Sequence, residues 1–315
     1  MEFWLTGWDG SRMELPQTLT WKLCYGLGEP CDSFQLMCIW DEAAAAALGK
    51  ATRFHAAEDG EKQFTGVVDE CETAWGPEGG RLRIHGRGMA ALLLDNEAVG
   101  ADYQVATLAD VLRDHVTPYG IATAGAARLP AVPGFSVDTG SSEWAVLYRF
   151  ARYHGGVIPW FDREGRLRLD GLEQNARRII GPETPVTRLA LNEKRYGVLS
   201  EVLVRDRTGR GSRRVVDQTF LDQGGQRRKV LTLPRKSGYE AMRYSGEYQL
   251  QRSAEERRKV TLRAAAGGLA WPGELVELRL ERPKVSGIWR VRESETGVDA
   301  GGRYTELVLT YEGEG

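Results

Sequence analysis

The first 86 residues alternate apolar and polar positions in short segments, which is the pattern of half-buried β-strands. Turn-forming residues separate the segments, and Asp59-Gly60 is a strong hairpin signal because these residue types accept the positive φ angles of a tight turn. The pattern predicts a meander of about five or six strands, folded as a small barrel or sandwich. The strand segments are residues 18–27, 32–40, 51–59, 62–75 and 81–86.

The next part of the chain has the period of helices instead. The expected helical segments are residues 88–98, 107–120 and 141–156. Thr107 with Asp110 three residues later resembles a capping box, and Ser141 or Ser142 can cap the third helix. Residues 157–172 then predict a hairpin, so this interval reads as a small α/β unit.

From about residue 186 the strand pattern returns, interrupted by one helical segment over residues 238–259. The two β blocks show no repeat residue by residue. We therefore expect a mainly β fold with an α/β insert. The expected domains are residues 1–98 for the first β block with its closing helix, 99–185 for the insert and 186–315 for the second β block, with 186–195 alternatively completing the first block.

Composition fits a globular protein of more than one domain: 315 residues, 35.0 kDa, 42% hydrophobic and 27% charged. The chain starts without a basic segment followed by an apolar one, and it lacks an apolar stretch of the roughly 20 residues that span a bilayer. We expect folding in the cytoplasm and no stable membrane insertion.

The small net charge of −2 hides an asymmetry. Residues 1–80 carry 5 basic against 14 acidic side chains, whereas residues 195–263 carry 17 basic against 8 acidic ones. The two surfaces are either separately solvated or complementary faces that meet in an assembly, since opposed potentials orient association.

Cysteine and histidine give no support for a metal site. The cysteines are Cys24, Cys31, Cys38 and Cys71, a spacing that lacks the close pair of a zinc knuckle. The histidines are His55, His85, His115 and His154, which are far apart in sequence. We expect free, packed thiols and no bound metal.

Residues 86–91 match the glycine-rich dinucleotide fingerprint through Gly86, Gly88 and Ala91. The strand before them alternates polar and apolar residues, which is typical of an antiparallel strand with one solvent-exposed face. The fingerprint instead requires a buried parallel strand. Asp110, near the distance of a ribose-binding acid, falls at a helix start. We expect neither a nucleotide nor another cofactor.

The other candidate catalytic and nucleic-acid-binding motifs are equally weak. Residues 138–140 spell the Asp-Thr-Gly of aspartic proteases once, directly before a helix, and Asp95 and Glu97 point to different helix faces. The arginine-rich stretches 205–214 and 226–229 read as charged hairpin tips in a slightly acidic chain. We expect no catalytic residues and no sequence-specific nucleic-acid binding.

Three segments, taken in order, resemble one known family. Residues 64–98 carry a strand with F-x-G-x-V and a strand ending in Gly-Arg that leads into a helix of the form LLDxEA. Residues 143–169 are similar to that family's helix and hairpin, and residues 272–311 to its C-terminal barrel strands. The family is that of baseplate hub proteins of contractile phage tails, the Mu-type hub and its relatives in PBSX-like prophages.

The resemblance implies a structural protein without enzymatic activity. Members of the family are homotrimers in which two tail-tube-like antiparallel β-barrels per subunit form a pseudo-sixfold ring, with a small mixed domain at the periphery. That ring adapts the sixfold tail tube to the threefold central spike. The implied partners are the tail tube protein, the central spike protein and baseplate wedge proteins, in a particle assembled in the bacterial cytoplasm.

Two other functions stay open, a tail tube initiator or completion protein and a hub that also carries cell-wall hydrolase activity. In either case Gly86, Arg87 and Gly88 are expected to form a structural turn, the glycines supplying backbone angles that other residues avoid. We expect Met89, Leu92 and Leu93 to face the end of the first barrel, and Arg87 to hydrogen-bond either inward or to a neighbouring subunit.

Overall fold

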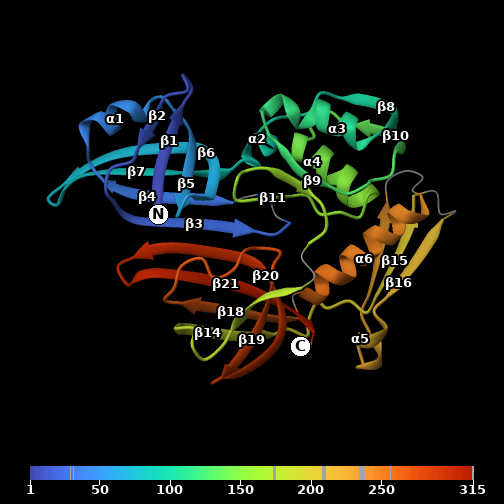
Figure 1. The fold of residues 1–315 in the computed structure, drawn as a ribbon. Coiled ribbons are helices and arrows are strands. Elements are labelled where there is room, and N and C mark those ends of the chain that lie inside the picture. Colours follow the sequence, from blue (N-terminus) through green and yellow to red (C-terminus); the bar gives the residue numbers. More distant parts are fainter. Residues whose placement is uncertain are drawn as a thin grey trace.

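The computed structural model describes residues 1–28, 30, 32–172, 175–207, 211–233, 238–255 and 257–313. The fold is mainly β, as expected, and its strands form one 13-stranded sheet and three small ones. Cys31 and part of the arginine-rich stretch 205–214 lie outside the described residues. Figure 1 shows two β units, one above the other, beside a mixed α/β unit and a helix with its own small sheet.

The first β unit consists of strands, as predicted, but it is not a meander, because strands that follow one another in sequence are not all neighbours in the sheet. Its strands are β1 (Glu2–Gly7), β2 (Arg12–Glu14), β3 (Thr18–Gly26), β4 (Ser33–Ile39), β5 (Ala51–Glu58), β6 (Glu61–Gly76) and β7 (Gly79–Gly88). They pair in the order β3-β4-β7-β6-β5-β1-β2 around an aromatic core in which Phe34 stacks on Phe54 at 3.9 Å between ring centroids. The predicted turn is confirmed, with φ of 53° at Asp59 and 80° at Gly60.

The first unit also contains a helix that the strand pattern does not predict, α1 (Glu42–Leu48). Its run of alanines has high helix propensity but no amphipathic period. Asp41 caps the helix by accepting a hydrogen bond from the Ala44 amide at 2.8 Å.

The second β unit comes from the end of the chain together with two earlier strands. Its strands are β13 (Ala176–Ile180), β14 (Val186–Glu193), β18 (Arg258–Ala264), β19 (Leu275–Glu281), β20 (Lys284–Asp299) and β21 (Gly302–Gly313). They pair in the order β14-β18-β21-β20-β19-β13 around a separate core that includes the fully buried Trp289.

The two β units repeat one strand arrangement. The order β3-β4-β7-β6-β5-β1 of the first unit corresponds strand by strand to β14-β18-β21-β20-β19-β13 of the second, except that β1 pairs with β5 antiparallel whereas β13 pairs with β19 parallel. Both long hairpins carry a bulge at the same place, between Val68 and Glu70 in β6 and between Val291 and Glu293 in β20, each position 223 residues after its counterpart. The fold thus contains a duplication that residue identities do not reveal.

The two β units join edge to edge within the chain. Strand β20 pairs with β3 antiparallel, Glu293 opposite Gly26 and Val298 opposite Trp21, so one hydrogen-bonded sheet runs through both units. An ion pair of 2.6 Å between Arg303 of β21 and Glu58 of β5 also crosses this junction.

The α/β insert has a core of its own. Its elements are α2 (Ala91–Leu94), β8 (Ala101–Ala106), α3 (Leu108–His115), η1 (Thr117–Tyr119), β9 (Thr123–Ala126), β10 (Val132–Val137), α4 (Glu143–Tyr148), η2 (Arg149–His154), β11 (Trp160–Phe161) and β12 (Leu167–Leu169). The predicted caps are confirmed, because Thr107 and Asp110 form a full capping box and Ser142 caps α4.

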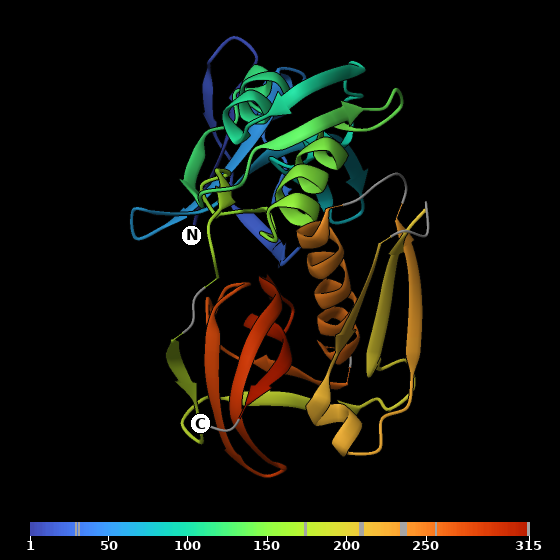
Figure 2. The ribbon, with the colours of Figure 1, turned by 90° about the vertical axis from the view of Figure 1, so that its right-hand side faces the viewer.

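Residues between β14 and β18 form a further small unit instead of strands of the second β unit. Strands β16 (Ser212–Val216), β15 (Glu201–Asp206) and β17 (Arg228–Leu233) pair in that order, next to the short helix α5 (Gln218–Asp222) where the pattern predicts strand. Helix α6 (Tyr239–Glu255) packs on β15 and β16 and stands between this sheet and the second β unit (Figure 2).

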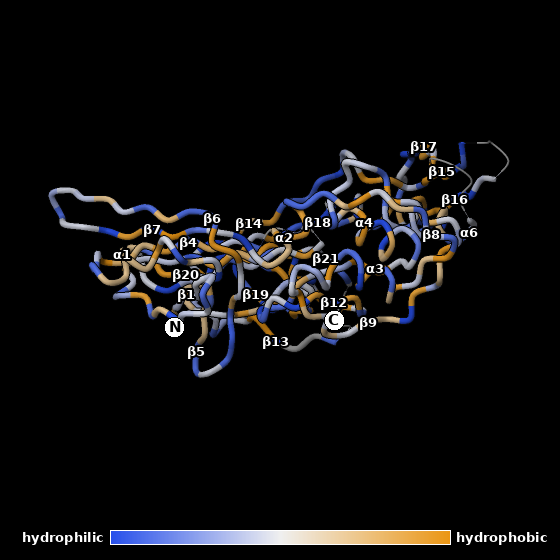
Figure 3. Tube along the Cα trace, turned by 90° about the horizontal axis from the view of Figure 1, so that it is seen from above, coloured by the Kyte–Doolittle hydropathy of each residue, from blue (hydrophilic) through white to orange (hydrophobic). Residues whose placement is uncertain are grey.

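Figure 3 shows the hairpin of β6 and β7 reaching out from the body of the molecule. Its tip is largely polar apart from Trp75, which is 66% exposed and packs against Trp40 at 4.7 Å between ring centroids. Among the described residues, no helix is long and apolar enough to cross a membrane.

Candidate functional site

Arg87 ties the end of β7 to the strand and the helix beside it. Its guanidinium donates to Asp69 of β6 at 2.7 and 2.9 Å and to Asp95 after α2 at 3.0 and 2.7 Å. These bidentate bonds raise the pKa of Arg87, Asp69 contributing most, and lower the pKa of Asp95. Within the chain Arg87 therefore points to Asp69 and Asp95 and fixes where the insert departs from the first β unit.

The residues expected to form a turn lie in the strand instead. Gly86 and Gly88 belong to β7, neither has a positive φ, and the turn follows at Met89 and Ala90. The reason for glycine is close approach: a Cβ at Gly86 would stand 2.0 Å from the Val67 carbonyl oxygen and 2.8 Å from the Phe34 ring. Glycine is needed here for space rather than for unusual backbone angles.

The apolar side chains of this segment also point elsewhere than expected. Met89 and Leu93 are buried in the core of the insert and Leu92 packs against it, so they do not fill the end of the first β unit. Val67 of β6 also packs against this insert core. The helix has a single turn, because after Leu94 the chain is held by Arg87 and by a bridge from Glu97 to Ser142.

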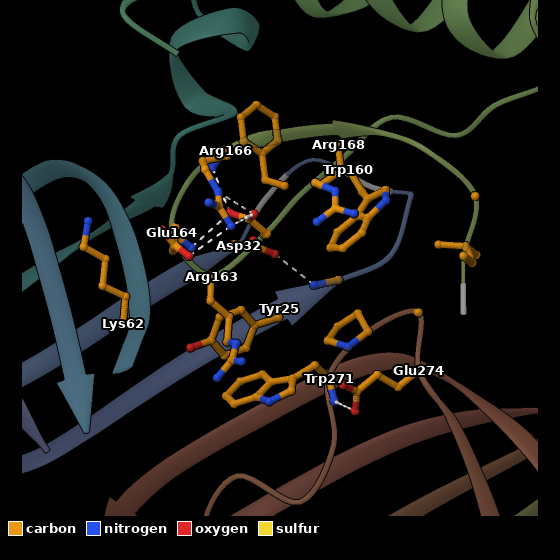
Figure 4. Close-up of a pocket in the computed structure, with 17 residues that line it drawn as sticks. Tyr25, Asp32, Lys62, Trp160, Arg163, Glu164, Arg166, Arg168, Trp271 and Glu274 are labelled. Atoms are coloured by element: carbon orange, nitrogen blue, oxygen red, sulfur yellow. Dashed lines mark hydrogen bonds and ion pairs between the residues drawn. The ribbon is translucent and has the colours of Figure 1, made fainter. Parts of the chain in front are cut away.

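A cavity of about 340 Å³ lies where the two β units and the insert meet (Figure 4). The first β unit contributes Tyr25 and Asp32, the insert contributes Trp160 and Arg163, and the loop before β19 contributes Trp271. Four of these five residues are aromatic or carboxylic. Together they come from three segments that are distant from one another in sequence. Sequence reasoning missed this site, because only the tertiary fold brings the three segments together.

Arginines lie over the aromatic rings of this junction. Arg163 stands 4.6 Å from the ring centroid of Trp271, and Arg168 stands 5.4 Å from that of Trp160. Trp271 in turn meets Tyr25 edge to face at 4.9 Å. Arg163 of the insert, Trp271 of the second β unit and Tyr25 of the first thus form a continuous row of contacts across three units.

Burial shapes the acids and phenols of the junction. Tyr25 donates its hydroxyl to the Gln63 carbonyl at 2.7 Å, and burial raises its pKa well above the ordinary value. Burial also raises the pKa of Asp32 to about 7, although the Gly26 amide, donating at 3.0 Å, favours the ionised form. Arg166 pairs with Asp162 at 2.8 Å, and Arg163 donates to the side-chain oxygen of Gln63 at 2.9 Å. The chemistry is that of a tightly packed joint between units.

The insert holds a buried polar network that the sequence did not single out. His115 Nδ1 lies 2.6 Å from Glu143 Oε2, and both residues are about 5% exposed or less. Tyr119 donates to the other oxygen of Glu143 at 2.9 Å, and the Tyr103 hydroxyl lies 3.2 Å from His115 Nε2. The buried pair of His115 and Glu143 joins α3 to α4, and the two tyrosines that contact it are partly exposed. The sequence signal for this network is a histidine on an otherwise apolar helix face.

The other residue classes are placed as follows. Cys24, Cys38 and Cys71 are free thiols, as predicted, and Cys31 lies outside the described residues. In the part of the chain that the structure describes, no group of His, Cys, Asp or Glu is arranged to hold a metal ion. Arg214 and Arg228, from the two arginine-rich stretches, both pair with Glu201 inside the small sheet, at 2.8 and 2.7 Å.

Comparison with known proteins bears on the whole chain. Residues 90–171 match the family model of the baseplate hub protein gp44-like, second domain. No curated protein sequence matches the chain.

Solved structures with a similar fold cover nearly all of it. A tail protein from Neisseria meningitidis MC58 is 17% identical with a TM-score of 0.79, covering 98% of this chain and 96% of its own. The 43 kDa tail protein of prophage MuSo2 from Shewanella oneidensis is 16% identical with a TM-score of 0.76, covering 98% of both.

A third structure comes from a secretion system. The E. coli c3393 protein, described as a component of the type VI secretion system with structural similarity to T4 bacteriophage tail proteins gp27 and gp5, is 13% identical with a TM-score of 0.60. The alignment covers 95% of this chain and 74% of that one. Residues 90–171 therefore match the second domain of gp44-like baseplate hub proteins, and the fold of the whole chain is similar to that of phage tail proteins.

Proposed function

We propose that the protein is the structural hub of a contractile tail, a homotrimeric ring that adapts a sixfold tail tube to a threefold central spike. The observation that carries this proposal is the internal duplication. Two β units with the same strand order and the same bulge stand side by side in one chain. Three such chains would present six similar β units to a sixfold tube while keeping threefold symmetry toward a spike.

The domain organisation follows the two β units. The first unit ends with β7 at Gly88 instead of residue 98, because Met89 and Leu93 belong to the insert core. The insert runs to about residue 172, and the second β unit begins with β13. Residues 199–255 form an elaboration of that second unit, with its own small core under α6.

The hub acts by assembly and not by catalysis. Its junction cavity is lined by arginines that already face rings or carboxylates, and its buried histidine and glutamate bond to each other. The protein would be assembled in the bacterial cytoplasm into a baseplate, between the tail tube protein and the spike protein and beside wedge proteins. Incubation with purified peptidoglycan should release no soluble fragments, and release would overturn the non-catalytic role.

The decisive experiment is the mass and shape of the full chain in solution. Native mass spectrometry should give a three-copy particle, and electron microscopy should show a ring of six similar lobes around a central channel. A chain that stays monomeric when mixed with the spike and tube proteins of its own particle would overturn the proposal. Retention of a tail-terminating partner in place of the spike would favour a tail completion protein.

A further inference from the structure

The outer part of β6 and the whole of β14 are among the strand edges of the long sheet that lack a second strand partner in the described residues. Strand β6 pairs with β5 only as far as Val67, so from Glu70 to Trp75 it pairs with β7 alone. Strand β14 pairs with β18 alone along its whole length. Exposed strand edges present unpaired amide and carbonyl groups and invite pairing with another chain.

The duplication assigns a counterpart to each of these edges. Strand β20 corresponds to β6, and its residues Glu293–Val298, which follow the same bulge, pair with β3. Strand β3 corresponds to β14 in the two strand orders. The open edges of β6 and β14 are therefore the counterparts of the two edges that meet at the junction between the β units.

The register follows from the pairings across each unit. Trp21 lies opposite Leu36, which lies opposite Ile84, and in the second unit Leu189 lies opposite Leu262, which lies opposite Leu307. Leu307 is the counterpart of Ile84 by the same 223-residue displacement that relates the two bulges. Leu189 is thus the counterpart of Trp21.

We propose that the open edge of β6 in one copy pairs antiparallel with β14 of a second copy, Glu70 opposite Lys194 and Trp75 opposite Leu189. This inference rests on the proposed ring and names the surfaces that close it. It places Thr73 opposite Leu191 and Cys71 opposite Glu193, because the junction between the β units places Thr296 opposite Leu23 and Ser294 opposite Tyr25.

The side chains of both edges suit this pairing. At the junction within the chain, Val298 faces Trp21, which is 7% exposed. In the proposed contact Trp75 faces Leu189, again one tryptophan and one aliphatic residue. Trp75 is 66% exposed and Leu191 is 42% exposed, and both lie on the face of the strand that corresponds to the buried face of the junction.

Charge also favours this pairing. The edge of β6 carries Glu70 and Glu72 on its other face, and β14 leads into Lys194 and Arg195. The two edges belong to the acidic segment 1–80 and the border of the basic segment 195–263. Potentials of opposite sign favour a head-to-tail contact between copies over contacts between like edges.

Disulfide trapping in the full-length chain tests the register. Opposed residues of an antiparallel pair have Cα atoms about 4.5–5.5 Å apart, within the range of a disulfide. The variant Glu193→Cys places a thiol opposite the native Cys71 of the next copy. Diamide accepts the two electrons and two protons that the thiols release, and non-reducing gels report the products.

Matched variants provide the positive and negative controls for this crosslink. Glu295→Cys should form a disulfide within one chain with native Cys24, its partner at the junction, whose sulfur lies 3.4 Å from the Glu295 carboxylate. Asn192→Cys points to the opposite face of β14 and should give less than a tenth of the product. Glu193→Cys with Cys71→Ser should give none. The pair Thr73→Cys with Leu191→Cys provides an independent second position.

The expected result is a ladder of covalent dimers and trimers that ends at three chains. Absence of products between chains from both positions, while Glu295→Cys forms its bond, overturns the inference. If the unmodified protein is nevertheless a three-copy ring by native mass spectrometry, the proposed function stands and only the interface is wrong. A ladder that continues past three chains supports the strand pairing and overturns the closed trimer.

Discussion

Gly86 is the position where one methyl group should cost the most stability in the first β unit. A Cβ there would lie 2.0 Å from the Val67 carbonyl oxygen and 2.8 Å from a carbon of the Phe34 ring. Both neighbours are confined, since Val67 is paired with Arg87 across the strands and Phe34 stacks on Phe54. Neither can retreat by about an ångström without moving β6 or opening the aromatic core.

The cost of Gly86→Ala can be worked from these contacts. Overpacking a core costs about 1–3 kcal/mol, and each ladder hydrogen bond that is lost as β6 moves costs about 1 kcal/mol. We expect about 3–4 kcal/mol against the local stability of β6, β7 and β4. Because about 1.4 kcal/mol is a factor of ten, amide hydrogen exchange in these strands should be roughly 10²–10³ times faster.

Hydrogen exchange followed by mass spectrometry is the suitable assay, because a chain of several units need not unfold in one step. Gly76→Ala is the matched control: it lies in β6, and a Cβ there meets nothing within 4 Å. This control should exchange like the unmodified protein. If Gly86→Ala also exchanges within about threefold of it, glycine is not required there for close approach and the steric reasoning fails.

Three other substitutions test the joints between units. Arg87→Gln removes the ion pairs to Asp69 and Asp95 and should destabilise α2 by about 1–2 kcal/mol, less at high salt. Hydrogen exchange of α2 measures the effect, with Arg83→Gln, which breaks one exposed ion pair, as the control. Glu143→Ala leaves His115 buried without its carboxylate and should cost about 3 kcal/mol, seen as faster exchange in α3 and α4 but not in the β units. Burial raises the pKa of Asp32 from 3.8 to about 7, so the folded chain keeps a proton there that the unfolded chain loses above about pH 4. Stability should therefore fall as pH rises from about 4 to 7, and Asp32→Asn should reduce that fall, measured as the thermal unfolding midpoint at pH 5 and pH 8; an equal fall in both proteins would contradict it.

The sequence predicted elements well where residues close in sequence interact with one another. The capping box of Thr107 and Asp110 is such a case, because its hydrogen bonds join residues three apart. The Asp59-Gly60 turn is another. Helix α2 is shorter than its run of helix formers, since Arg87 and the bridge from Glu97 to Ser142 hold the chain after Leu94.

The alternation of apolar and polar residues did not predict which strands pair with one another. Alternation marks β15 as a strand but cannot tell that it pairs with β16 and β17 in a sheet apart from the second β unit. The duplication could not be predicted for a related reason, because the two β units share their strand order and a bulge but not their side chains. The junction cavity needs Tyr25, Arg163 and Trp271 together, and nothing local links them.

Fusion of two β units in one chain has a kinetic consequence for the proposed ring. The junction between β3 and β20 forms as the chain folds, at the high effective concentration of groups within one molecule. Half of the contacts around a ring of six units are then complete before any two chains meet. Three chains meet in two bimolecular encounters, whereas six single units need five, so ring formation at low protein concentration should depend on a much lower power of that concentration than it would for a ring of single units.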